Sequence, residues 1–181
     1  MRGRYEGAWN VVRFNWPKYV GGLLIVVLFG ILAAELTGAG RIAFIVLTAL
    51  GCIALLLPLL ASHLIYDRSA LYRMPWLDLL PDQASRAVLN LNAGFDEISP
   101  ALQQRFSECT LHVLDFYDAA LHTEASIERA RKAYAPYPGT RPVRTNGLPF
   151  AAGTLDLVVA FLALHEVRDA NERLRFLKEI H

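Results

Sequence analysis

The sequence predicts a membrane helical hairpin followed by an α/β domain with a parallel sheet, and three observations lead to this prediction. First, the stretch 19–66 contains only Glu35 and Arg41 as charged residues. Second, 54% of the 181 residues are hydrophobic and the mean hydropathy is +0.30, which is high for a soluble protein. Third, the rest of the chain alternates short apolar strands with polar helical stretches, which is typical of an α/β fold. A single soluble domain over the whole chain is therefore excluded.

Two apolar runs, 19–34 and 42–66, predict two transmembrane helices, and the connector 35–41 is expected to turn in the headgroup region. At a rise of about 1.5 Å per residue, a hydrocarbon core of roughly 30 Å needs about 20 residues, so the first run must borrow length from its flank. Residues 1–18 form that flank and are expected to be an amphipathic segment in the cytoplasm. A cleaved signal peptide is the alternative, but two tryptophans and Pro17 separate the basic start of the chain from the apolar run.

Basic residues flank the two runs on the side of the chain ends, whereas the connector contains Arg41 alone. Because the cytoplasmic flanks of membrane helices are rich in Lys and Arg, we expect both termini in the cytoplasm and the protein in the cytoplasmic membrane. The flanking basic residues are Arg2, Arg4, Arg13, Lys18, Arg68 and Arg73. Aromatic residues on the same flanks are expected to form a belt at that interface. They are Trp9, Trp16, Tyr19, Tyr66, Tyr72 and Trp76.

Small and titratable residues inside the runs offer further roles. Gly21, Gly22 and Gly30 in the first helix allow another helix to approach closely. His63 lies near the end of the second run, where it is either an interfacial histidine among headgroups or a ligand for a metal or pigment.

The α/β domain is expected over 84–181, after a linker at 67–83 that is punctuated by prolines. The apolar run 87–91 predicts a buried strand, and a turn follows it at 92–96. A helix is expected over 99–106, with the serine at its start as the cap and the following proline in its first turn.

A second strand is predicted over 110–114, ending in Asp115, and a helix over 126–134 follows it. Val143 is the centre of a weak strand, and Asn146-Gly147 predicts a turn.

The run 155–161 is the most apolar strand of the domain and suits a central parallel strand that is covered on both faces. A final amphipathic helix is expected over 171–180, with Leu174 and Leu177 at helical spacing.

Four segments between about residues 86 and 181 carry a resemblance to a known family. They are V-L-N-L-N-A-G at 88–94, Asp115, L-P-F at 148–150 followed by G-T-L-D-L-V-V at 153–159, and L-H-E-V at 164–167. Their order and spacing resemble the class I S-adenosylmethionine-dependent methyltransferases, in particular the small-molecule methyltransferases that share a Leu-Pro-Phe signature.

The resemblance implies a Rossmann-like domain that binds S-adenosylmethionine and transfers its methyl group to an acceptor. It implies that 88–94 is the first strand with its glycine-rich loop and that Asp115 is the acid that binds the ribose hydroxyls. The acid that contacts adenine in the family has its nearest equivalents in Thr145 and Asn146. The candidate cofactor-binding residues are therefore Asn90, Asn92, Gly94, Asp96, Asp115, Asn146 and Leu148.

The glycine-rich loop departs from the family pattern, since Asn92 and Asp96 replace two glycines and only Gly94 remains. Glycine permits a positive φ and a close approach of the backbone to a ligand, and asparagine tolerates the same backbone region. Asp96, however, adds a side chain and a negative charge where the amino-acid end of the cofactor would lie, and Asn90 replaces the usual acid at the end of the strand. We therefore expect S-adenosylmethionine binding to be weak or lost.

The resemblance also predicts that the domain is incomplete at its C-terminus. The family has seven strands, and the residues here reach the helix after the fourth. Either the natural protein ends here, in which case the sheet edge that the fifth strand would cover is exposed and invites a partner, or the sequence is cut short.

Three groups of polar residues have two interpretations each. His165 is a candidate general base, because imidazole titrates near neutral pH, or simply a polar residue at the lip of a strand. Asp115 is a ligand-binding acid at the carboxyl end of a strand or, together with Asp118, a cap of the next helix. A third group is a solvated helix face or a contact for anionic lipid. It consists of Arg129, Arg131 and Lys132.

Two functions remain open at this point. The first is a membrane-anchored methyltransferase that acts on a lipid or a membrane-associated acceptor. The second is a non-catalytic, methyltransferase-like subunit with a structural or assembly role in a larger integral membrane complex. The expected partners are the lipid bilayer and other membrane subunits. A net charge of +1 predicts no nucleic-acid partner, and no motif predicts a metal site.

Overall fold

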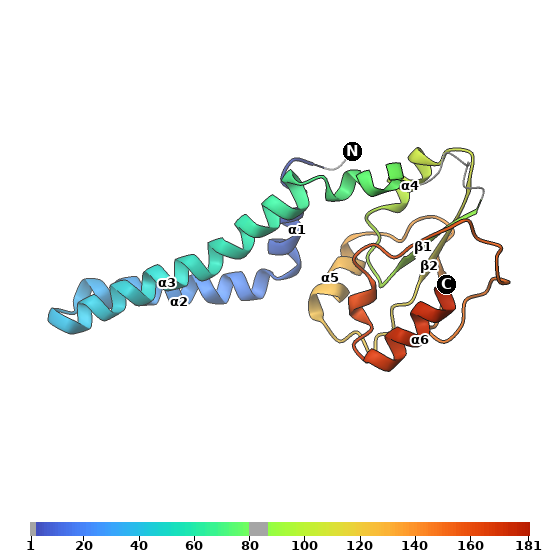
Figure 1. Ribbon diagram of the computed structural model, residues 1–181. Coiled ribbons are helices and arrows are strands. Elements are labelled where there is room, and N and C mark those ends of the chain that lie inside the picture. The colour runs from blue at the N-terminus through green and yellow to red at the C-terminus, as the bar shows by residue number, and fades with distance from the viewer. Residues whose placement is uncertain (1–2, 80–86) are drawn as a thin grey trace. The chain divides into compact units, whose positions relative to one another are not determined.

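A computed structural model describes residues 3–79 and 87–181, so that Arg2 and the part of the predicted linker and domain start at 80–86 lie outside the described residues (Figure 1). The chain divides into two compact units, Met1–Leu77 and Asp78–His181. We refer to them as the hairpin unit and the α/β unit.

The hairpin unit contains two long apolar helices, as predicted. After α1 (Glu6–Phe14), α2 spans Trp16–Glu35 and α3 spans Gly38–Ser62, and both are long and apolar enough to cross a membrane. The two helices lie side by side in Figure 1. The chain continues as a π-helix, η1 (His63–Arg68), and then in two 3-10 turns, η2 (Leu71–Arg73) and η3 (Pro75–Leu79).

The predicted connector 35–41 was too long. The α2 helix runs to Glu35 and α3 starts at Gly38, so only Leu36 and Thr37 join them. Gly38 has a φ of +57°, a value that glycine adopts without a steric penalty, and it allows the chain to reverse within this short connection. At its other end, α2 begins at Trp16 with a proline in its first turn and so takes up part of the expected flank.

Glycine contacts hold α2 and α3 close together. A Cβ added to Gly22 would lie 2.7 Å from a methyl carbon of Leu55, and one added to Gly51 would lie 2.6 Å from Val26. Gly22 therefore has the packing role predicted for it, with α3 as its partner. Gly21 and Gly30 face open space instead.

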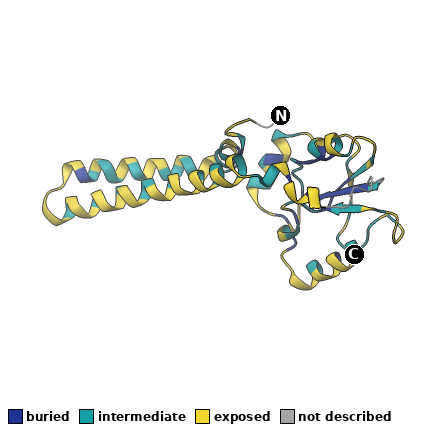
Figure 2. Ribbon diagram, turned by 45° about the horizontal axis from the view of Figure 1, so that its top comes forward, coloured by how far each residue is buried: buried dark blue, intermediate teal, exposed yellow. Residues whose placement is uncertain are grey.

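The α/β unit contains a parallel sheet of four described strands in the order β3-β2-β1-β4. The strands are β1 (Ala87–Asn92), β2 (Thr110–Asp115), β3 (Arg141–Pro142) and β4 (Leu157–Val159). The predicted pairing of the first strand with the most apolar run is confirmed, because Val88 lies opposite Leu157 in parallel register. Burial is highest along β1, which Figure 2 shows in dark blue.

Two predicted strands differ in length or position. The most apolar run forms a strand only over Leu157–Val159, and just before it the Asp156 carboxylate accepts the backbone N–H of Ala87 at 2.8 Å. The weak strand expected around Val143 lies at Arg141–Pro142, although the Val143 N–H still bonds to the Asp115 carbonyl. The neighbouring turn consists of Thr145 and Asn146, one residue before the predicted turn.

The helices of the α/β unit follow the predicted order, and two details correct the prediction. They are α4 (Ser99–Arg105), α5 (Ala125–Ala133), the 3-10 turn η4 (Leu164–Glu166) and α6 (Ala170–Ile180). Ser99 lies inside α4 and does not cap it. On α6, Leu174 and Leu177 are exposed, and Phe176 is the residue that is fully buried against the sheet core at Leu91 and Phe116.

Candidate functional site

The carboxyl edge of the sheet is the place where ligands bind in open α/β folds. The chain leaves β1 toward β2 and β3 on one side, and β4 lies on the other side of β1. In open α/β folds, ligands bind beyond the carboxyl ends of the strands at such a reversal of strand order. Asn92 and Asp115, which end β1 and β2, lie opposite each other in the register at this edge.

The turn after β1 is held by the side chain of Asn92. The side-chain oxygen Oδ1 of Asn92 accepts the N–H of Gly94 at 3.1 Å, and the side-chain Nδ2 donates to the Leu114 carbonyl at 3.3 Å. Gly94 has a φ of +93°. Asparagine at position 92 thus makes a local Asx turn and ties β1 to β2, and Gly94 supplies the positive φ that the turn requires.

The carboxylate of Asp96 binds the start of α4. Its Oδ1 atom accepts the N–H groups of Ile98 at 3.1 Å and Ser99 at 3.0 Å. It also accepts the side-chain amide of Asn90, which in turn donates to the Ser99 hydroxyl at 2.9 Å. Asp96 is therefore the residue that satisfies the helix start, a role predicted for Ser99. The second oxygen, Oδ2, is buried and has no hydrogen-bond partner among the described residues.

Arg131 covers the site next to this turn. Its guanidinium forms an ion pair with Asp115 and lies over the ring of Tyr117, at 4.3 Å from the ring centroid. A Cβ added to Gly94 would lie 3.0 Å from Arg131 Nη1 and 3.0 Å from Tyr117 Cδ2. Arg131 is exposed, as the predicted solvated face of α5 requires, and its side chain also fills the space above the glycine. We call Gly94, Asp115, Tyr117 and Arg131 the Arg131 cluster.

The other acidic groups of the β2–α5 connection stabilise local turns. The second oxygen of Asp115 accepts the N–H of Tyr117 at 2.9 Å, and Asp118 accepts the N–H of Ala120 at 2.8 Å. The predicted alternative, in which Asp115 and Asp118 cap the next helix, is wrong, because Glu124 precedes the first residue of α5.

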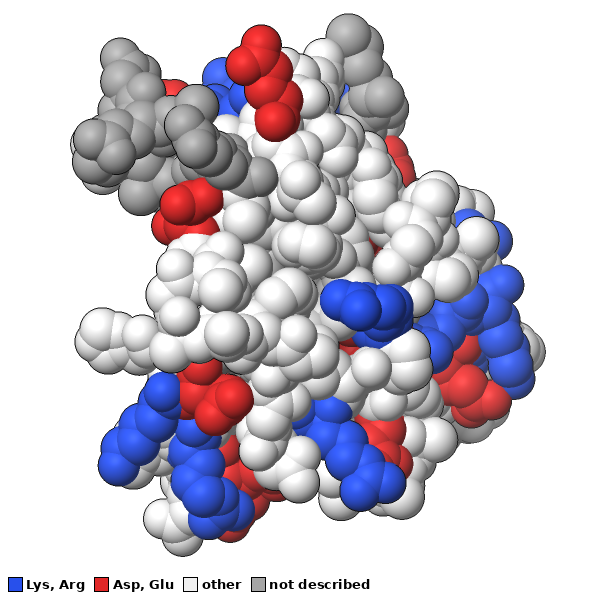
Figure 3. All heavy atoms as spheres, turned by 90° about the vertical axis from the view of Figure 1, so that its right-hand side faces the viewer, with Lys and Arg blue, Asp and Glu red and all other residues white. Residues whose placement is uncertain are grey.

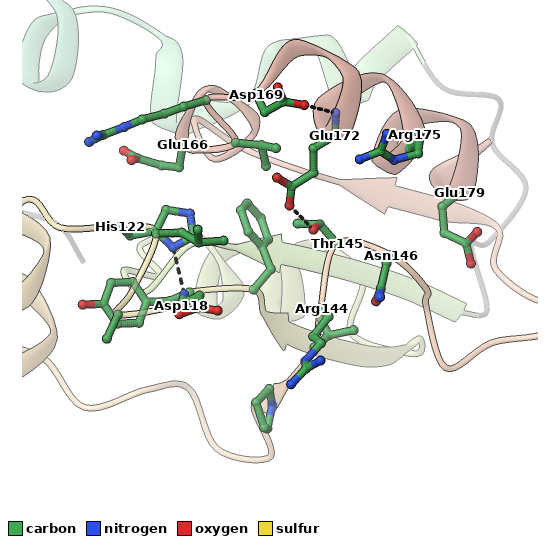
Figure 4. Close-up of a pocket in the computed structure, with 18 residues that line it drawn as sticks. Asp118, His122, Arg144, Thr145, Asn146, Glu166, Asp169, Glu172, Arg175 and Glu179 are labelled. Carbon is green, nitrogen blue, oxygen red and sulfur yellow. Dashed lines mark hydrogen bonds between the residues drawn. The ribbon is translucent and has the colours of Figure 1, made fainter.

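A cavity of about 1250 Å³ lies between the ends of β2 and β3 and the helix α6 (Figure 4). It is larger than the roughly 300–1,000 Å³ of typical small-molecule pockets and is open to solvent. Asn146 is the predicted cofactor residue that lines it. A hydrogen bond between Thr145 and Glu172 closes one side, and Asp169 caps α6 by accepting the Glu172 N–H at 2.7 Å.

His122 is a buried residue that lines this cavity, a role that the sequence did not predict. The ring is 4% exposed, and its Nδ1 atom accepts the N–H of Asp118 at 2.8 Å. It also stacks on Tyr117 with ring centroids 5.5 Å apart. Because Nδ1 accepts a hydrogen bond, the neutral ring carries its proton on Nε2 and offers a donor.

The remaining predicted site residues make no contact with the Arg131 cluster that the structure records, and each has other partners. Leu148 packs against the hydrophobic core, and its N–H donates to Glu179 at 3.0 Å. His165 lies on η4 with its side chain 70% exposed, and its Nε2 atom is 3.1 Å from the Glu166 carboxylate. In the hairpin unit, His63 pairs with Asp67 at 3.1 Å and stacks on Tyr5.

Metal binding gains no support from the part of the chain that the structure describes, because no group of three or more His, Cys, Asp or Glu residues there could hold an ion. On the face shown in Figure 3, basic and acidic side chains lie beside one another.

The evidence for a function comes from these residues themselves. The sequence did not predict that Arg131, Tyr117 and His122 belong to the candidate site. For Arg131 the reason is its distance of sixteen positions from Asp115, because no local pattern links the two. No family model, no curated protein and no solved structure matches this chain.

Proposed function

We propose that the protein is a membrane-anchored, methyltransferase-like subunit that does not catalyse methyl transfer and has a structural or assembly role in a larger integral membrane complex. One observation carries the proposal: Arg131 pairs with Asp115 and fills the space above Gly94. The resemblance assigns that carboxylate to the ribose of S-adenosylmethionine and the space beside the loop glycine to the bound cofactor. A side chain of the protein itself satisfies the groups that would otherwise bind the cofactor.

The sheet supports the Rossmann-like part of the proposal. Its parallel order β3-β2-β1-β4 corresponds to the first four strands of the doubly wound order 3-2-1-4-5-6. The acid at the end of β2 and the turn after β1 lie at the edge where this fold binds nucleotides.

The residues at this edge fit the cofactor poorly. Asn92 uses its amide group for Gly94 and Leu114, and Arg131 would have to leave Asp115 before a ribose could approach. An ion pair with a half-buried guanidinium contributes only about 1 kcal/mol or less when solvent screens it. Breaking this pair would therefore lower the binding free energy of a cofactor by a small amount. Arg131 and Tyr117 also occupy the space above Gly94, and we therefore expect weak binding or none.

A second candidate, the active methyltransferase, is favoured by Asp96. Its Oδ2 atom is buried and without a partner among the described residues, and an ammonium group such as that of the cofactor's amino-acid end would satisfy it. Once bound, S-adenosylmethionine would supply the methyl group, and Asp96 and Asp115 would hold its two ends. The acceptor would be a lipid or a membrane-associated molecule.

Calorimetric titration of the full-length protein in lipid nanodiscs with S-adenosylmethionine separates the two candidates. The non-catalytic proposal predicts no saturable heat for the wild type and measurable binding after Arg131→Ala, which removes the guanidinium from the space above Gly94 and frees Asp115. Arg129→Ala is the matched control on the same helix and should behave as the wild type. Micromolar binding by the wild type that Asp115→Ala abolishes would overturn the proposal and establish the enzyme.

The assembly role needs a separate measurement. In native membranes extracted with a mild detergent, the protein should migrate as part of a complex well above its own 20.2 kDa, and Asp115→Ala should leave that mass unchanged. Migration as a single chain with bound detergent would contradict the assembly role.

The membrane topology is tested by cysteine labelling in cells, on a background of Cys52→Ala and Cys109→Ala. With both termini in the cytoplasm, Thr37→Cys in the connector should react with an impermeant reagent in intact cells. Glu108→Cys, an exposed position of the α/β unit, should react only after the membrane is opened. The reverse pattern would contradict the proposed orientation.

A further inference from the structure

The first helix exposes an aromatic face although it is docked on the hairpin. Gly7, Asn10 and Phe14 are its buried residues, and they recur at the spacing of one helix face. Trp9, which is 61% exposed, lies on the opposite side, and Tyr5, the residue just before the helix, is 57% exposed although its ring stacks on His63. At four residues per step, Arg13 follows Trp9 on this outer side and is exposed as well. We call Tyr5, Trp9 and Arg13 the outer face of α1.

The rotation of α1 about its own axis is fixed, so this exposure is built into the unit. Asp67, at the end of the hairpin, accepts the N–H of Gly7 at 2.7 Å and that of Ala8 at 3.2 Å. The Asp67 side chain is fully buried, and His63 pairs with it while stacking on Tyr5. A carboxylate at the first N–H groups of a helix is favoured by hydrogen bonding and by the helix dipole. Turning the outer face inward would break these bonds.

The position of α1 along the hairpin matches the depth of a membrane interface. It contacts α3 and η1 at the end of the hairpin opposite the connector, beside the last turns of α3 (Figure 1). The helices α2 and α3 expose apolar side chains along their length, and the outer face of α1 continues that surface with tryptophan and tyrosine. Tryptophan and tyrosine are enriched at the level of lipid headgroups.

The basic residues near α1 indicate that the lipid is anionic. Arg4 lies over the ring of Tyr5 at 5.5 Å, and Lys18 is exposed just after the α1–α2 junction. Glu6, the acid of α1, is already hydrogen-bonded to the N–H of Gly3. Aromatic rings combined with basic groups suit the headgroup region of an anionic leaflet.

We infer that α1 is an interfacial membrane helix whose outer face binds anionic phospholipid beside the hairpin. The inference rests on the proposed membrane insertion of α2 and α3. It assigns to α1 a second role besides hairpin packing, because the helix sets the depth and the rotation of the hairpin in the leaflet.

Fluorescence quenching in nanodiscs tests the inference on the full chain. One variant keeps Trp9 as its single tryptophan through Trp16→Phe and Trp76→Phe. A reference variant has no native tryptophan and carries Leu24→Trp, an exposed position in the middle of α2. The discs contain phosphatidylglycerol brominated either near the headgroup end of the acyl chain or near its middle.

Lipid contact at the interface predicts that Trp9 is quenched at least twofold more by the shallow bromines than by the deep ones. The Leu24→Trp reference should show the opposite order. Replacing phosphatidylglycerol by phosphatidylcholine should raise the quenching of Trp9 by acrylamide, an uncharged aqueous quencher that the lipid charge does not repel, since the basic residues then lose their partner.

The outcomes separate the two levels of the argument. If Leu24→Trp is not quenched by deep bromines, the hairpin is not inserted, and the proposed function fails together with the inference. If Leu24→Trp is quenched but Trp9 responds to acrylamide alone, the hairpin is inserted and the inference is overturned. Shielding of Trp9 from both acrylamide and bromine would also overturn it, because protein would then cover the outer face.

Discussion

Gly94→Ala provides the most direct test of the Arg131 cluster. Alanine at a φ of +93° is strained, and the new methyl group would lie 3.0 Å from Arg131 Nη1. Gly139 is a matched control, because it has a φ of +81° and no atom within 4 Å of an added Cβ. In both variants, alanine must adopt a positive φ, which lowers the free energy of unfolding by about 1–2 kcal/mol. Only Gly94→Ala also displaces Arg131.

The additional cost of Gly94→Ala follows from the ion pair that it disturbs. Hydrogen bonds to charged groups contribute about 1.5–3 kcal/mol. The Arg131 side chain is 38% exposed and that of Asp115 12%, so solvent screening reduces this value to about 1 kcal/mol. Gly94→Ala should therefore destabilise the α/β unit by about 1 kcal/mol more than Gly139→Ala.

A double-mutant cycle with Arg131→Ala isolates this contribution. The unfolding free energy is measured by pulse proteolysis of the nanodisc-embedded protein at increasing urea concentration. In the Arg131→Ala background, the difference between the two glycine variants should fall to a few tenths of a kcal/mol, which the ring of Tyr117 accounts for. The reasoning is refuted if the difference persists at about 1 kcal/mol without Arg131, or if the two glycine variants cost the same in the wild-type background.

Three further outcomes follow from individual side chains. Asp67→Ala should accelerate hydrogen exchange of the Gly7 amide by about 10–100-fold, because two charge-assisted bonds of the α1 N-terminus are lost; an unchanged rate would mean that Asp67 does not hold α1. Phe176→Ala should destabilise the α/β unit by about 3–5 kcal/mol and Leu177→Ala by less than about 1 kcal/mol, since Phe176 is fully buried and Leu177 is 42% exposed. Burial raises the pKa of the Cys109 thiol, so less thiolate is present at pH 7.5 and iodoacetamide should alkylate the folded protein more slowly than the urea-unfolded one. Equal alkylation rates in the two states would contradict that shift.

Features that depend on local sequence were predictable. Long apolar runs gave the two membrane-length helices, because length and hydropathy suffice to define such a segment. The strand at 110–114 and the helix at 126–134 were placed within one residue of β2 and α5. The parallel neighbours β1 and β4 followed from the family resemblance, since periodicity carries no information on which strands pair.

Features that depend on distant residues were missed or misplaced. The buried face of α6 was read from Leu174 and Leu177, but the helix packs through Phe176, and only the position of the sheet decides which face of an amphipathic helix is covered. Asp67 could not be linked to α1 from the sequence, because sixty positions separate it from Gly7.

The Arg131 cluster shows why substitutions in a loop alone do not decide whether a site binds its ligand. Asn92 and Asp96 were predicted to be the obstacles, yet both side chains are used inside the fold, one to form the turn around Gly94 and the other to bind the start of α4. Replacing Asp96 by glycine would remove the α4 cap and lower the stability of the unit, so that variant cannot report on cofactor binding alone. Arg131 lies on the surface of α5 and can be removed without loss of a core contact. If the loop at 92–96 can bind S-adenosylmethionine, Arg131→Ala is the single change that should reveal it. If that variant binds nothing, the buried Oδ2 atom of Asp96 is a property of the fold and not the remnant of a cofactor site.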